Sequence, residues 1–172
     1  YATKFSVDYL SNDGRLIRID DDSCFLVLPE GADVPKGLDD EITVLQRPAE
    51  HIYLAASAAM DHFCKIGALD AVSFTGTKSS DWYIDEVKNA MEEGNLHYAG
   101  KYNMPDYELI LKEKCPLAVE STMIFHTPEV KEQLEENGVP VLVDYSSYEQ
   151  HPLGRSEWIK LYGVLTGHEQ EA

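Results

Sequence analysis

The sequence predicts an α/β fold, a Rossmann-like and mainly parallel sheet flanked by helices, with an amino-terminal β-hairpin extension. Two observations predict this architecture. From Ile42 onward, short apolar runs alternate with longer segments of helical period, which is typical of βα units. Before Ile42, stretches that alternate apolar and polar side chains flank Asn12-Asp13-Gly14, a sequence typical of a hairpin turn.

Residues 1–41 form the predicted β-hairpin extension. Its three strand-like runs are rich in β-branched and aromatic residues, as half-exposed strands are. These runs are KFSVDYL, RLIRID and CFLVLPE. Residues 30–40 are rich in Pro, Gly and Asp and therefore predict a loop.

Four apolar runs predict buried strands, each followed by a helix. In order, they are ITVLQ before a helix near HIYLAASAAMDHFCKIG, AVSFTG before DWYIDEVKNAMEEG, PLAVES before TPEVKEQLEENG, and VPVLVDY before a helix that begins near His151. Between the second and third pairs, LHYAGK predicts an edge strand or an extended loop. MPDYELILKEK predicts a helix capped by Asp106, and Thr127 before Pro128 predicts another capped helix start.

Composition and charge exclude several classes of function. The chain has 172 residues, with 31 acidic and 14 basic side chains and a net charge of −17. Because such a charge repels phosphate backbones, nucleic acid is not an expected partner. No apolar run approaches the length of about 18 residues that spans a bilayer, so we expect contact with a membrane only through a lipid anchor outside this sequence. The three cysteines and six histidines show no metal-ligand spacing, and we expect no metal and no cofactor.

The candidate ligand-binding residues stand where the predicted strands end. In an open α/β sheet, ligands bind in the crevice beyond the carboxyl ends of the strands. Glu120, Ser121 and Thr122 follow a strand that is predicted to be buried, so they either face this crevice or cap the helix that follows. Arg47 either pairs with an anionic group of a ligand or closes an internal ion pair. The full candidate set is Arg47, Thr77, Tyr102, Glu120, Ser121, Thr122 and Ser147.

The sequence favours binding over catalysis, and it predicts no catalytic residue. The motifs G-x-S-x-G, G-x-x-x-x-G-K-[ST] and H-E-x-x-H are absent, and FTGTKSS lacks the further glycines of a phosphate-binding loop. Two alternatives stay open. One is a small α/β enzyme that acts on a nucleotide-like ligand with Glu120 or His126 as a base. The other is a surface adhesion or interaction domain, which the acidic charge and the hairpin extension suggest.

Several stretches resemble the amino-terminal lobe of the periplasmic binding proteins of ABC importers that serve ferric siderophores, haem and cobalamin. The resemblance covers roughly residues 42–172 and is carried by KIGALDAVSFTG, DYELILKEKCPLAVES, VKEQLEENGVPVLVDYSSYE and RSEWIKLYGVLTGHEQEA. The last of these resembles the start of the long helix that links the two lobes of the family. Residues 156–172 accordingly predict an amphipathic helix that continues to the last residue.

The resemblance implies a domain division, a ligand class and partners. Residues 1–41 would be the β-hairpin extension, residues 42–155 the amino-terminal lobe and residues 156–172 the start of the inter-lobe helix, with the second lobe outside this sequence. The implied ligand is an iron(III) chelate or a cobalamin-like molecule, with a molybdate-like oxyanion as a third choice. The lobes would deliver it to the permease subunits of an ABC importer, at the extracellular face as a lipoprotein or in the periplasm. The resemblance also implies that Glu129 docks on arginines of the permease, although a helix-dipole role in the first turn explains the same residue.

Overall fold

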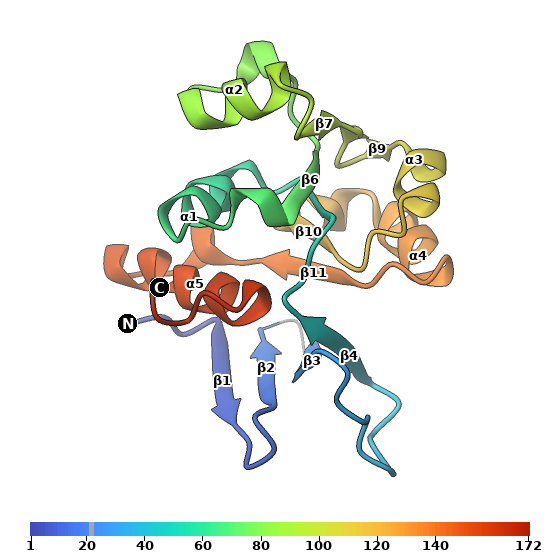
Figure 1. Cartoon of the computed structure of the whole chain (residues 1–172), viewed down its shortest axis with the longest axis vertical. Helices are drawn as coiled ribbons and strands as arrows, with labels where there is room; N and C mark the ends of the chain where they lie inside the picture. The colour runs from blue at the N-terminus through green and yellow to red at the C-terminus, as the bar shows by residue number, and fades with distance from the viewer. Residues whose placement is uncertain (21–22) are drawn as a thin grey trace. The chain divides into compact units, whose positions relative to one another are not determined.

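The computed structural model describes residues 1–20 and 23–172. They form two compact units, each with its own sheet (Figure 1). One unit contains residues 1–49 and 145–172, and the other contains residues 50–144.

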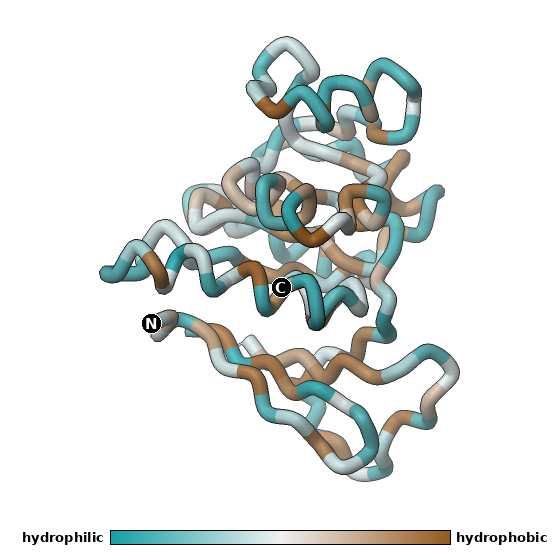
Figure 2. The backbone as a smooth tube through the Cα atoms, turned by 60° about the vertical axis from the view of Figure 1, so that its left-hand side comes forward, coloured by the Kyte–Doolittle hydropathy of each residue, from teal (hydrophilic) through white to brown (hydrophobic). Residues whose placement is uncertain are grey.

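The first unit contains a four-stranded sheet in the order β1-β2-β3-β4. Its strands are β1 (Phe5–Tyr9), β2 (Arg15–Ile19), β3 (Cys24–Pro29) and β4 (Ile42–Arg47). The predicted hairpin is confirmed, because β1 and β2 pair antiparallel and Asp13 in their turn has a φ of 60°. Figure 2 shows both hydrophilic and hydrophobic residues along this part of the chain.

The prediction that ITVLQ is the first strand of the parallel α/β sheet is wrong. This run is β4, which pairs in parallel with β3 from Cys24↔Ile42 to Pro29↔Arg47. A strand inside a parallel α/β sheet is covered on both faces. In β4, only Leu45 is buried, so the strand suits the half-exposed sheet instead.

Helix α5 (Pro152–Thr166) supplies much of the core of the first unit. Trp158, Leu161 and Leu165 are fully buried, and the Ala49 amide donates to the Leu165 carbonyl at 2.8 Å. The prediction that this helix continues to residue 172 is wrong. It ends at Thr166 because Gly167 adopts a left-handed φ of 77°.

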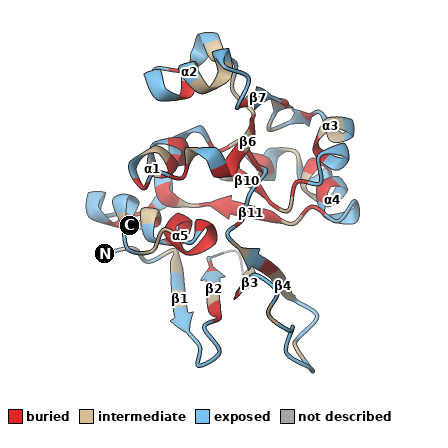
Figure 3. Ribbon diagram, viewed as in Figure 1, coloured by how far each residue is buried: buried red, intermediate tan, exposed pale blue. Residues whose placement is uncertain are grey.

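The second unit contains the predicted parallel sheet, in the order β11-β10-β5-β6-β7. Every neighbouring pair of these strands is parallel. The strands are β5 (Ile52–Leu54), β6 (Val72–Thr75), β7 (His97–Tyr98), β10 (Ala118–Ser121) and β11 (Val141–Asp144). Figure 3 shows that β6, β10 and β11 are largely buried, as their apolar runs predict. Within LHYAGK, His97 and Tyr98 form the edge strand β7, whereas Gly100 and Lys101 belong to a separate two-stranded sheet.

Helices and short turns connect these strands. The α-helices are α1 (Met60–Lys65), α2 (Asp85–Glu92), α3 (Tyr107–Lys112) and α4 (Pro128–Glu136). The remaining elements are η1 (Ser57–Ala59), η2 (Leu69–Ala71), η3 (Ser79–Asp81), η4 (Thr122–His126) and the hairpin of β8 (Gly100–Lys101) and β9 (Met104–Pro105), with η5 (Ser146–Tyr148) in the first unit. None of the helices in the described residues is long and apolar enough to cross a membrane.

The helix boundaries test three predictions. Asp106 caps α3 as predicted, because its carboxylate accepts from the Leu109 amide at 3.0 Å. Thr127 does not cap α4 with its side chain, since its hydroxyl instead lies 3.5 Å from the Ile124 carbonyl. The first part of HIYLAASAAMDHFCKIG is strand β5 rather than helix, and all three of its residues are buried.

Candidate ligand-binding site

The parallel sheet brings several polar segments to one edge. Because β5, β6, β7, β10 and β11 all run in the same direction, their carboxyl ends share an edge of the sheet. We call the segments at this edge the rim. They are residues 76–83 after β6, residues 98–104 at and after the end of β7, and residues 121–125 at and after the end of β10.

Four of the seven predicted ligand-binding residues lie on the rim. Thr77, Tyr102, Ser121 and Thr122 are each half-buried, so part of each side chain remains accessible. The Ser121 hydroxyl accepts from the Met123 amide at 3.3 Å and thus caps η4. Capping was one of the two roles considered for this segment, and the contact of these four residues with a ligand stays a prediction.

The backbone of the rim is closely packed at two glycines. The Tyr53 hydroxyl donates to the Gly100 carbonyl at 3.0 Å, which links β5 to the β8–β9 hairpin. Gly100 has a φ of +83°, and a Cβ there would lie 2.3 Å from the Met104 carbonyl oxygen. A Cβ on Gly76 would lie 3.2 Å from Ala55 Cα. Only glycine fits at position 100, so these segments hold one another in place.

The rim also carries exposed apolar side chains that the predicted set of ligand-binding residues does not include. Large apolar side chains normally avoid such exposure when they gather on one edge. They are Tyr83, which is 95% exposed, Met104 at 74%, Met123 at 47%, Phe125 at 46% and Tyr98 at 37%. For Met123 and Phe125, the signal that could have found them is their position between the predicted strand PLAVES and the predicted helix TPEVKEQLEENG.

Glu120 does not face the crevice as expected. It is fully buried, and neither oxygen of its carboxyl group has a hydrogen-bond partner among the described residues. Burial raises the pKa of Glu120 to about 9, so the group is uncharged at neutral pH. The pKa of Tyr107 is also raised, chiefly by burial and then by the charges of Glu129 and Glu120.

Arg47 and Ser147 belong to the first unit. Arg47 ends β4 in the first unit, where its guanidinium donates to the carboxylate of Asp13 and lies 4.0 Å from that of Glu169. The internal ion pair, one of the two roles considered for Arg47, is therefore present. Ser147 is exposed in η5 of the same unit. Contact of either residue with a ligand stays a prediction.

Glu129 is exposed in the first turn of α4, as the docking prediction requires. The same position lets its carboxylate stabilise the positive end of the helix dipole. Neither role excludes the other.

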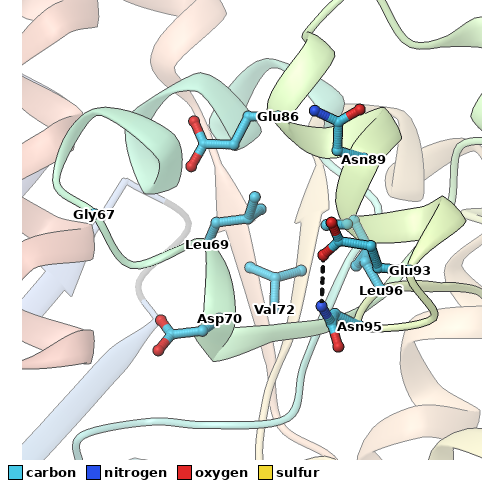
Figure 4. A pocket seen from close by; sticks show the side chains of 10 residues that line it. Gly67, Leu69, Asp70, Val72, Glu86, Asn89, Glu93, Asn95 and Leu96 are labelled. Atoms are coloured by element: carbon cyan, nitrogen blue, oxygen red, sulfur yellow. Dashed lines mark hydrogen bonds between the residues drawn. The ribbon is translucent and has the colours of Figure 1, made fainter.

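Two cavities of the second unit lie away from most of the rim. One, of about 410 Å³, opens near the amino end of β6 above the apolar side chains of Leu69, Val72 and Leu96. Figure 4 shows Glu86 of α2 and Glu93, the residue after this helix, beside it, and the side-chain amide of Asn95 donates to the Glu93 carboxylate at 3.1 Å.

The other cavity, of about 470 Å³, lies between β6, β7 and α3. Its lining includes His51, whose Nδ1 is 3.1 Å from the Ser73 hydroxyl. Neither cavity contains a predicted site residue. Within residues 1–20 and 23–172, no group of three or more His, Cys, Asp or Glu side chains is arranged to hold a metal ion.

Comparison with known proteins relates this architecture to binding proteins. No family model matches the chain. An uncharacterized lipoprotein of Methanocaldococcus jannaschii is 24% identical over 147 residues, which is 78% of this chain and 34% of that protein. The crystal structure of a periplasmic binding protein from Veillonella parvula matches with a TM-score of 0.59 and 14% identity, over 99% of this chain and 49% of that one.

A second solved structure has a similar match. It is the iron uptake ABC transporter substrate-binding protein PiuA from Streptococcus pneumoniae, with a TM-score of 0.58 and 16% identity, over 80% of this chain and 45% of that one. The chain thus spans about a third of the curated relative and less than half of each solved structure. Its fold is therefore that of one part of a periplasmic binding protein.

Proposed function

We propose that this chain is the amino-terminal lobe of a solute-binding protein of an ABC importer. The rim would hold an iron(III) chelate against a second lobe, which then hands it to the permease. The single observation that carries the proposal is the joint presence, on the carboxyl edge of one parallel sheet, of accessible hydroxyls and exposed apolar side chains. Hydroxyl groups can fix the orientation of a ligand, and aromatic rings can supply contact area.

The similar proteins support this role, its location and the ligand class. One of them is named as an iron uptake substrate-binding protein, and another as a lipoprotein. We therefore place the protein at the extracellular face of the membrane or in the periplasm, acting by binding rather than by catalysis. A cobalamin-like ligand remains the alternative occupant of the same rim.

Removing two rim hydroxyls together, in a Thr77→Ala and Thr122→Ala double variant, is expected to weaken ligand binding about tenfold or more. Each lost hydrogen bond contributes about 1 kcal/mol. The full-length protein would first be screened by thermal shift with ferric hydroxamates, ferric catecholates, haem and cobalamin, because a bound ligand raises the melting temperature. Calorimetry would then give the dissociation constant of the best ligand for each variant.

The matched control is Thr43→Ala on β4, a half-buried threonine outside the parallel sheet. It should leave the dissociation constant unchanged. The proposal is wrong if no ligand in the screen binds, or if the double variant binds as tightly as the unaltered protein.

Glu129→Lys is expected to abolish delivery of the ligand to the permease without changing the affinity for the ligand. A lysine would face the permease arginines with a like charge. Stimulation of the importer's ATPase in proteoliposomes measures docking, and calorimetry measures ligand binding. Glu92→Lys, an exposed glutamate on α2, is the control. If Glu129 serves only the helix dipole, Glu129→Lys will lower the melting temperature and leave ATPase stimulation intact.

A further inference from the structure

The basic side chains of the rim are few. Residues 50–144 contain no arginine, so the second unit offers no guanidinium to clamp a carboxylate or catecholate with two parallel hydrogen bonds. The rim segments contain two lysines, Lys78 and Lys101. The ammonium of Lys78 lies 5.8 Å from the centre of the Tyr98 ring, where the ring face stabilises it.

Acidic side chains dominate the unit around the rim. Residues 50–144 contain seventeen Asp and Glu against seven Lys, and all of these acids except Glu120 and Asp144 lie outside the buried core. A surface with this excess of carboxylates repels anions and attracts cations as they approach. The effect reaches about 8 Å from the surface at physiological salt.

The buried carboxyl group of Glu120 is a second argument against an anionic ligand. This carboxyl group is fully buried at the end of β10, immediately before the rim hydroxyls of Ser121 and Thr122, and the described residues give it no hydrogen-bond partner. A buried cation at such a position could pair with a bound anion. Here the buried group is an acid, and an anion bound nearby would oppose its ionisation further.

We propose that the rim selects chelates of zero or positive net charge and rejects polyanionic chelates. The ligand would be contacted by the rim hydroxyls and by the exposed rings and thioethers of Tyr83, Tyr98, Met104, Met123 and Phe125. The negative charge of the unit would exclude polyanionic chelates. The inference rests on the proposed function, because it describes the ligand of the same rim.

The test compares three ferric chelates on the full-length protein. Ferrioxamine B is cationic, ferrichrome is neutral and ferric enterobactin is a polyanion. We expect at least one of the first two to bind about tenfold or more tightly than the third at low salt. Added salt should reduce the ratio of the affinity for ferrioxamine B to that for ferric enterobactin, because it screens the charges. Calorimetry at low and high salt measures both effects.

Thr122→Arg is a gain-of-charge variant for the same experiment. It should raise the affinity for ferric enterobactin relative to ferrioxamine B by about tenfold, and circular dichroism would confirm that the variant is folded. Lys112→Gln, at an exposed lysine of α3 outside the rim, should leave the binding of ferrioxamine B unchanged.

The outcomes separate the inference from the proposed function. If ferric enterobactin binds most tightly, the charge inference is overturned while an iron-chelate function stands. If none of the three chelates binds and no other iron chelate does, the proposed function itself fails and the inference falls with it.

Discussion

Replacing Glu120 by Gln is expected to stabilise the protein by about 3 kcal/mol near pH 7. The pKa of the buried carboxyl group is about 9 in the folded protein, against an ordinary value of 4.5. At neutral pH, folding must therefore transfer a proton onto a group that is ionised in the unfolded chain. Each unit of pKa difference corresponds to about 1.4 kcal/mol. Glutamine keeps the shape of the neutral acid and removes this requirement.

The same difference in the pKa of Glu120 determines how the stability of the protein changes with pH. Between about pH 4.5 and about pH 9 the folded state holds more protons than the unfolded state, so Glu120 makes stability fall as pH rises through this window. Below this pH window, Glu120 is protonated in both the folded and the unfolded state. The unaltered protein and the Glu120→Gln variant should then unfold at the same urea concentration. Urea unfolding near pH 5, 7 and 9 measures the effect, with the exposed Glu113→Gln as control. A Glu120→Gln variant that is less stable than the unaltered protein near pH 8 would show that Glu120 is charged and paired.

Replacing Glu149 by Gln is expected to destabilise the protein by about 3 kcal/mol. The carboxylate of Glu149 is almost fully buried in the first unit. It accepts from the Thr3 amide at 2.9 Å, the Lys4 amide at 2.9 Å and the Trp158 indole at 3.1 Å. Hydrogen bonds to a charged acceptor contribute more to stability than hydrogen bonds between neutral groups. In the glutamine variant, the NH2 group would also replace one accepting oxygen and face the N–H donors. The variant should therefore loosen the segment that leads into β1.

The pH dependence at Glu149 has the opposite sign to that at Glu120. Burial alone would raise the pKa of Glu149, but the hydrogen bonds from Lys4, Thr3 and Trp158 outweigh it and lower the pKa below its ordinary value. The stabilisation is present above the unfolded pKa of about 4.5 and is lost as pH falls through the lower folded pKa. Urea unfolding near pH 7 and pH 3 measures it, and the loss in Glu149→Gln should shrink at the lower pH. Glu30→Gln, exposed in the same unit, serves as control. Equal stability of Glu149→Gln and the unaltered protein at pH 7 would contradict the role of this carboxylate.

The parallel sheet was predictable where local pattern alone defines a strand. β6, β10 and β11 are short apolar runs followed by helices with clear starts and glycine at their ends. β5 was missed because its three apolar residues run directly into the small apolar residues before α1, and such a run fits a buried helix as well as a strand.

The partners of a strand and the exposure of a side chain were less predictable. The sequence of β4 predicts a strand but not its pairing with β3. Because of this pairing, Arg47 does not lie at the edge of the parallel sheet where it was expected. Likewise, an acid at the end of an apolar run can lie in the crevice or beneath it. Only the packing around Glu120 shows that it is buried. Three-dimensional neighbours decide both properties, and no local pattern records them.

The tight fit at Gly100 has a consequence for how specificity could change in this scaffold. The peptide backbone there has no room for a side chain, and the Tyr53 hydroxyl fixes it to β5. Adaptation to a new molecule must then come from exchanging residues such as Thr77 and Tyr102, since the main chain beneath them cannot readily yield. Relatives with different cargoes should accordingly differ at those side chains while keeping glycine at position 100.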